Sequence, residues 1–245
     1  MAKRSGLGQR LLVGGYDISG DIQALDNVHG GPALLDTTDI TQSAKSRING
    51  LRDGGMGVSV FFDTANAHPV LDALPTTDVA VSYLMSTTSG DQAACLIAKQ
   101  VGYDPTRAAN GALMLKTQFD ANGYGLEWGE QLTAGLRTDT TATAGAVTDD
   151  GAATNYGGQA YLQVTAFSGT SVTVAVQHAT TSGGSYANVT GLAFTAVTAA
   201  PAWQRLATSN ALTIDEYVKV TTTGTFTSAT FSVVFVRNLT AGQVF

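Results

Sequence analysis

The stretch AYLQVTAFSGTSVTVAVQHA, residues 160–179, alternates apolar and polar side chains over most of its length. Leu162 and Val164 follow a period of two, which resumes at Val172 and Val174. This period places one row of side chains in a core and the other in water, as in a half-buried β-strand. The SGTS segment between the two runs is a hairpin signal, so the stretch predicts two antiparallel strands.

Further short strand patterns follow in this half of the chain. Threonine makes up 23 of the 110 residues from 136 to 245, and its branched side chain packs on a pleated surface while its hydroxyl stays hydrated. About seven short strands in some 85 residues predict an Ig-like antiparallel β-sandwich over residues 158–245. The additional patterns are GLAFTAV (191–197), QRLAT (204–208), EYVKVTTTG (216–224) and ATFSVVFVRN (229–238).

The first half also carries strand patterns, here mixed with two candidate helices. GMGVSVFFD (55–63) and DVAVSYLMS (78–86) alternate with a period of two. TQSAKSRINGLRDGG (41–55) predicts a short flanking helix, and HPVLDALP (68–75) predicts a single helical turn. We therefore expect a mainly β protein with little helix.

The segment GYDISGDIQAL, residues 15–25, places two acids four residues apart in a polar run. Alternation through the segment predicts one strand with Gly20 as a bend or bulge. In that strand one row of side chains faces water. The wet row consists of Asp17, Ser19, Asp21 and Gln23.

Composition changes near residue 136, which indicates two domains. Residues 1–135 hold nine basic and fourteen acidic residues, for a net charge of −5, whereas the rest of the chain is nearly neutral. The small, polar run over 138–157 predicts a linker or long loop. We expect domains at 1–137, with a basic N-terminal arm at 1–10, and at 158–245. The whole-chain net charge of −6 argues against a general nucleic-acid binder.

The chain offers little material for catalysis or metal binding. The three histidines, His29, His68 and His178, follow no metal-ligand spacing, and the single cysteine, Cys95, has a core pattern around it. No nucleophile elbow or phosphate-binding loop is present. We expect no catalytic residue, no metal and no cofactor, and hence not an enzyme. The apolar run near the N-terminus is too short for a signal peptide, so we expect synthesis in the cytoplasm.

Several of these segments together resemble the start of major tail proteins of long-tailed bacteriophages. The likeness lies in a "YDlSGd"-like opening, an aspartate–threonine segment, a "GLRDG" motif and a strand that ends near "FFD". Here the matching residues are Tyr16–Asp21, Asp36–Thr41, Gly50–Gly54 and Val58–Asp63. The second half resembles an added β-sandwich on such phage proteins.

This resemblance implies a tail-tube fold, a β-sandwich or barrel with a short flanking helix. Six subunits would close a ring whose inner strands form one barrel, and stacked rings would form the tube through which DNA leaves. The implied partners are further copies of the chain, tape-measure, terminator and initiator proteins, and DNA that passes without specific binding. The implied location is the virion tail, after assembly in the host cytoplasm.

A bore for DNA should repel phosphate, because lysine and arginine contacts would retain the strand. We expect an acidic strand face to line it, either Asp17, Asp21 and Gln23 or a later face. The later face is Lys116, Gln118 and Asp120. The alternative is that these acids lie on outer, solvent-exposed strands.

Two further surfaces are candidates for contacts. The N-terminal arm could pair Arg4 and Arg10 with acids of a neighbouring ring. The other function class is a surface- or carbohydrate-binding module, with Trp203 of the second half as the stacking residue and the host cell surface as partner. Packing of Trp203 in the sandwich is the simpler interpretation.

Overall fold

The computed structural model describes residues 5–241 and confirms a mainly β protein, with 59% strand and 3% helix. Its contacts divide the chain into two compact units. Residues 21–78 and 96–127 form one, called here the four-strand unit. Residues 1–20, 79–95 and 128–245 form the other, called here the sandwich unit.

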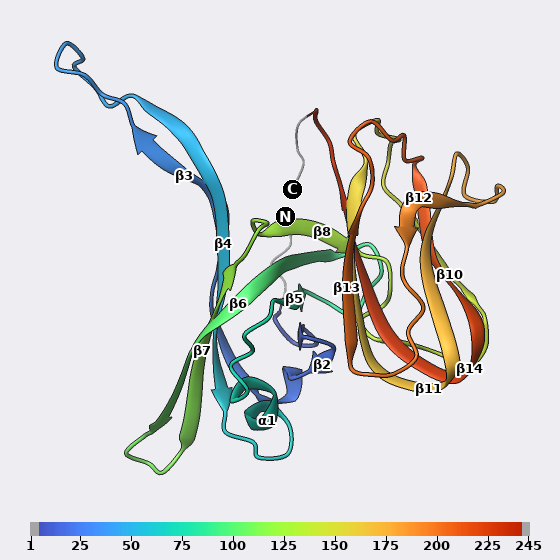
Figure 1. Cartoon of the computed structure of the whole chain (residues 1–245), viewed down its shortest axis with the longest axis horizontal. Helices are drawn as coiled ribbons and strands as arrows, with labels where there is room; N and C mark the ends of the chain where they lie inside the picture. The colour runs from blue at the N-terminus through green and yellow to red at the C-terminus, as the bar shows by residue number, and fades with distance from the viewer. Residues whose placement is uncertain (1–4, 242–245) are drawn as a thin grey trace. The chain divides into compact units, whose positions relative to one another are not determined.

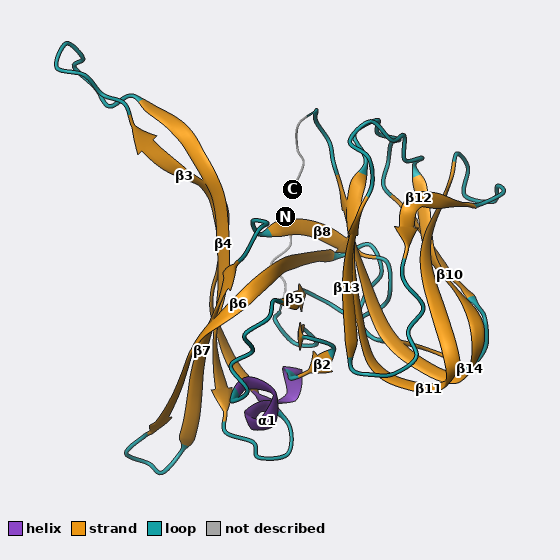
Figure 2. Ribbon diagram, in the orientation of Figure 1, coloured by secondary structure: helices purple, strands orange, loops and turns teal. Residues whose placement is uncertain are grey.

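The four-strand unit is an antiparallel sheet with one short helix (Figures 1 and 2). Its strands lie in the order β3–β4–β7–β6, and Met56, Val58 and Phe119 are buried on one face. Gln100 of β6 donates to the Leu71 carbonyl at the end of α1, which ties the helix to the sheet. The elements are β3 (Ile22–Asp36), β4 (Arg47–Phe61), α1 (Ala67–Leu71), β7 (Leu113–Ala121) and most of β6 (Gln92–Arg107).

The sandwich unit is built around two very long strands, β11 and β14, which pair along their whole lengths. Both are bent, so that the two ends of each strand pack around one apolar core that includes Leu162, Val174 and Phe231. Fourteen strands are assigned in the described chain. Those of this unit are β1 (Arg10–Val13), β2 (Tyr16–Asp17), β5 (Val79–Leu84), β8 (Glu127–Gln131), β9 (Arg137–Asp139), β10 (Ala144–Asp149), β11 (Gly158–Ala179), β12 (Ala187–Ala193), β13 (Ala202–Ala207) and β14 (Tyr217–Arg237).

The predicted hairpin at SGTS is wrong, because β11 continues through it. The register to β14 slips around Gly169, whose φ of 145° suits glycine. A Cβ on Gly169 would lie 2.4 Å from Phe226 Cα, so the close approach also requires glycine. The segment is therefore a bulge that bends a continuous strand, and local sequence does not distinguish such a bulge from a turn.

Two predictions in the first half are also wrong. The helix expected over 41–55 is a turn followed by β4, because Arg47 pairs with Asp36 and the chain runs back along β3. Three glycines in that segment disfavour helix. The strand expected over 15–25 is interrupted by a 3₁₀ turn at Ser19–Asp21, which includes the bend predicted at Gly20. The single helical turn is confirmed as α1.

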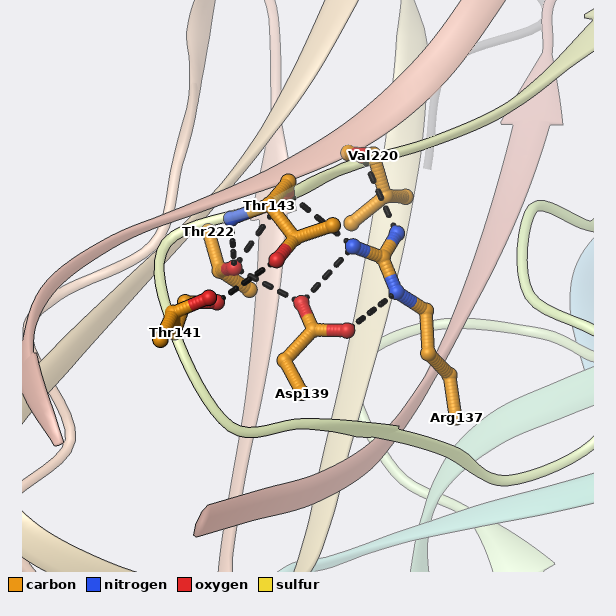
Figure 3. A network of polar contacts seen from close by, with 6 residues as sticks. All are labelled: Arg137, Asp139, Thr141, Thr143, Val220 and Thr222. Carbon is orange, nitrogen blue, oxygen red and sulfur yellow. Dashed lines mark hydrogen bonds and ion pairs between the residues drawn. The ribbon is translucent and has the colours of Figure 1, made fainter. Parts of the chain in front are cut away.

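The segment 138–157, predicted as a linker, carries β9 and β10, which both pair with β14. A buried ion pair holds it in place (Figure 3). Arg137 donates to both carboxylate oxygens of Asp139 at 2.7 Å, and Thr222 of β14 donates to Asp139 as well. Arg137 also donates to the carbonyls of Thr143 and Val220. These contacts make the segment part of the folded sheet.

The compact units do not follow the predicted boundary near residue 137. Among the contacts that cross this boundary is a set of hydrogen bonds from Gln163 of β11. Its side chain accepts from Gly15 N at 2.6 Å and donates to Ala80 O at 2.9 Å and Ser82 Oγ at 3.2 Å. These bonds join the first strands of the chain to the sandwich.

Candidate assembly surfaces

The first candidate surface is a polar face of the four-strand sheet. On β7, Leu115, Thr117 and Phe119 are buried, whereas Lys116 and Asp120 are exposed and Gln118 is partly exposed. By this alternation Lys116, Gln118 and Asp120 lie on one hydrated strand face.

Two glycines of β4, Gly55 and Gly57, lie in the middle of this face. Gly57 pairs with Gln118 and Gly55 pairs with Asp120, and on the other side they pair with Asn27 and His29 of β3. A Cβ on Gly57 would lie 2.6 Å from Gln118 Oε1 and 2.7 Å from Asn27 Nδ2. Because β4 has no side chains at these positions, the polar side chains of its neighbours cover its backbone.

The charge of the polar face is close to balanced. Three carboxylates and two lysines lie on it, for a formal net charge of −1 with His29 neutral. Ser59 donates to Asp26, and Lys99 is paired with Asp78 at 2.8 Å. A hollow of about 170 Å³ lies between Asp26, Asp104 and Lys116. Side-chain amides, in addition to charged groups, form this face. Its residues are Asp26, Asn27, His29, Gly55, Gly57, Ser59, Lys99, Val101, Asp104, Lys116, Gln118 and Asp120.

The other predicted row does not form a strand face. Asp17 is paired with Arg10 at 2.5 Å. Asp21 accepts from Asn66 Nδ2 at 2.9 Å and from Ala67 N at 3.2 Å, where α1 begins. Gln23 is exposed at the start of β3. The carboxylates of Asp17 and Asp21 therefore serve local structure, because the 3₁₀ turn removes the alternation that would have aligned them.

The second candidate surface is an exposed hairpin, residues 31–53, called here the arm. β4 pairs with β7 only over Gly55–Phe61, so beyond that point β3 and β4 run as a two-stranded ribbon (Figure 1). Almost every residue of the arm is exposed. Its large apolar side chains are exposed too: Leu34 63%, Leu35 50%, Ile40 104%, Ile48 55% and Leu51 88%.

The root of the arm is closely packed. Gly30 and Gly54 pair across the two strands, and Leu126 lies against both. A Cβ on Gly54 would lie 2.6 Å from Leu126 N, and one on Gly30 would lie 2.5 Å from Leu126 Cβ. Leu126 itself is only 6% exposed. The arm therefore leaves the sheet from a buried anchor.

The remaining predicted site residues lie elsewhere. Arg4 falls outside the described residues. Arg10 begins β1 and is paired with Asp17, so it is part of the folded sheet. Trp203 lies in β13 opposite Gln163, with its side chain partly buried.

Sequence reasoning missed the arm and the contributions of Asp26, Asn27 and His29. The weak signals were the run VHGGP within β3 and the spacing of Gly55 and Gly57, which suit a face covered by neighbouring side chains. Within residues 5–241, no group of three or more metal-ligating side chains is assembled. In the same range, no helix is long and apolar enough to cross a membrane.

Comparison with known proteins gives a weak likeness to solved structures. No protein-family model and no curated protein matches the chain. Among solved structures it is similar to the SPP1 Dit protein (gp 19.1), which is described as a hub of the adsorption apparatus in phages that infect Gram-positive bacteria. The match covers 94% of this chain and 99% of that chain at 12% identity and a TM-score of 0.35. A likeness this low bears on neither the fold nor the function of this chain.

Proposed function

We propose that this chain is a structural subunit of a phage tail that assembles with copies of itself into stacked rings around a bore for DNA. The observation that carries the proposal is the arm. A two-stranded ribbon is marginally stable alone in water, and its unpaired edges invite pairing with another chain. Exposed leucines and isoleucines along it are typical of a surface that a partner covers.

A second copy of the chain is the partner that this geometry favours. One end of the four-strand sheet carries the arm, and the sheet edges are formed by β3 and by the distal part of β6. Contacts between different surfaces of identical subunits generate rings when the rotation closes and filaments when it does not. The sequence resemblance to major tail proteins supports the ring, with six subunits as the expected number.

The polar face is the better candidate for the lining of the bore. It runs across four strands, whereas Asp17 and Asp21 are held in local contacts. Its lysines are outnumbered by carboxylates, and Gln118 and Asn27 present amides instead of further charge. Such a surface would give DNA few cationic contacts, and so little affinity from counterion release.

Electron microscopy of the purified chain across a concentration series tests the proposal. The expected result is hollow rings or tubes of uniform bore. In a test variant, an Asn-Gly turn that joins Gly30 to Gly54 replaces residues 31–53. This variant should stay monomeric. Its far-ultraviolet circular dichroism should lose only the strand signal of the deleted residues. Assembly of that variant into the same tubes would show that the arm is not the contact. A cryo-EM ring with a net basic bore would contradict the assignment of the polar face.

A further inference from the structure

A buried polar cluster in the sandwich unit takes no part in the surfaces described above. Its centre is Arg237 of β14, whose side chain is 8% exposed. Arg237 Nε donates to Asp150 Oδ2 at 2.5 Å, and Nη2 lies at the same distance from that oxygen. The remaining guanidinium hydrogens go to the carbonyls of Ile214 and Asp215, at 2.8 and 2.7 Å, and to Thr154 Oγ1 at 3.4 Å. The donors of Arg237 are therefore fully used.

Two carboxyl oxygens beside this ion pair have no donor. Asp150 Oδ1 and Glu130 Oε1 are both buried without a hydrogen-bond partner, and the Asp150 side chain is 5% exposed. Glu130 lies on β8 opposite Phe235, on the strand that carries Arg237. Glu130 and Asp150 line the same cavity, together with Arg237. Two carboxylates in this position would each be a buried acceptor without a donor, next to a like charge.

We propose that Glu130 is held as a neutral carboxylic acid that donates its proton to Asp150 Oδ1, so that one proton ties β8 to the segment after β10. A single hydrogen bond then satisfies both orphaned oxygens. It also leaves one negative charge, that of Asp150, to balance the positive charge of Arg237 in this ion pair. The proton is a pH-sensitive latch within the sandwich unit, independent of the proposed function.

The electrostatics of the cluster agree with this assignment. Burial, then the contact with Asp150 and its negative charge, raise the pKa of Glu130 to about 9, and Arg237 opposes the rise. Asp150 and Arg237 are the charged groups that act on Glu130. The other residues around the adjoining cavity of about 260 Å³ are neutral: Gln92, Trp128, Gly129, Phe235 and Leu239.

The direction of the pH effect follows from the raised pKa. The folded chain holds this proton more tightly than the unfolded chain, whose glutamate titrates near 4.5. The stabilisation is therefore complete below about pH 4.5 and falls as the pH rises, until Glu130 ionises in the folded state near pH 9. Between these two pH values, unfolding releases one proton, so each unit rise in pH increases the equilibrium constant for unfolding by about tenfold.

Glu130→Gln is the direct test, because its amide keeps the shape of the acid and offers an N–H to Asp150 Oδ1 at every pH. Urea unfolding of the full chain at a concentration that keeps it monomeric, at pH 5, 7 and 9, measures the effect. The variant should match the wild type at pH 5 and exceed it increasingly toward pH 9. Asp104→Asn, an exposed acid of the four-strand unit, should keep the wild-type pH profile.

Infrared spectroscopy gives a readout that does not depend on the variant folding well. The wild type at pH 7 should show the C=O stretch of a buried protonated carboxyl, which disappears with a midpoint near pH 9. Glu130→Gln should lack that band. A wild type without the band at pH 7, or a Glu130→Gln profile parallel to that of the wild type, would overturn the proposal.

Discussion

Leu51→Ser is the sharpest perturbation of the arm. Leu51 is 88% exposed in the isolated chain, so its removal should leave the folding of the monomer nearly unchanged. Complete burial of a leucine side chain contributes about 1.5–3 kcal/mol. If a neighbouring copy covers all of the exposed part, each contact loses about 1.3–2.6 kcal/mol. That corresponds to an increase of about 10- to 80-fold in the dissociation constant of the contact.

Sedimentation velocity across a dilution series measures the shift in the concentration at which half of the protein is assembled. Leu239→Ser is the matched control, since Leu239 is 65% exposed but lies outside the arm. The control should assemble as the wild type does. Identical half-assembly concentrations for Leu51→Ser and the wild type would refute the view that the apolar side chains of the arm are buried between copies. A large fall in the melting temperature of the monomer would show that Leu51 acts within its own chain.

Three further predictions concern the root of the arm, the buried ion pair and the bore. Gly54→Ala should lower the free energy of unfolding by about 1–3 kcal/mol by chemical denaturation, because its Cβ would overlap the backbone of Leu126; a neutral result would mean that Leu126 moves freely. Asp139→Asn should lower the free energy of unfolding by about 3 kcal/mol, since it leaves the charge of Arg137 largely buried without a counter-charge. Hydrogen exchange in this variant should rise first over residues 138–149. In a cryo-EM ring, Gln118 should face the bore, and its placement on the outer surface would remove the argument for the polar face.

In the candidate surfaces, a local period was enough to propose rows of polar side chains. The row Lys116, Gln118 and Asp120 was identified from alternation, and the structure places it on a hydrated face. The row that begins at Asp17 followed the same rule and is wrong, because the 3₁₀ turn at Ser19–Asp21 resets the period. A turn of three residues within a strand changes the local free energy little. The hydrogen bonds that Asp21 accepts at the start of α1 therefore determine that the turn forms.

The arm shows a different limit. Its β4 segment lacks the alternation of a half-buried strand, because neither face of the ribbon packs against the rest of the chain. Because this segment has no buried face, its sequence near Lys45 fits a capped helix as well as it fits a strand. Pairing of Asp36 with Arg47 across the hairpin settles the choice, and that pairing continues along β3 and β4 to Ile22 and Val60.

The sequence by itself determined that this chain is mainly β and that its second half is rich in strands. These properties follow from composition and from side-chain periodicity, which act over a few residues. The tertiary structure alone decided that β11 and β14 are each one continuous bent strand, and that 138–157 belongs to the sheet. It also placed Glu130 beside Asp150 and Arg237. Those outcomes depend on strand register and on contacts between residues that lie 20 to 107 positions apart in the chain. A pattern within a few neighbouring residues does not predict such contacts.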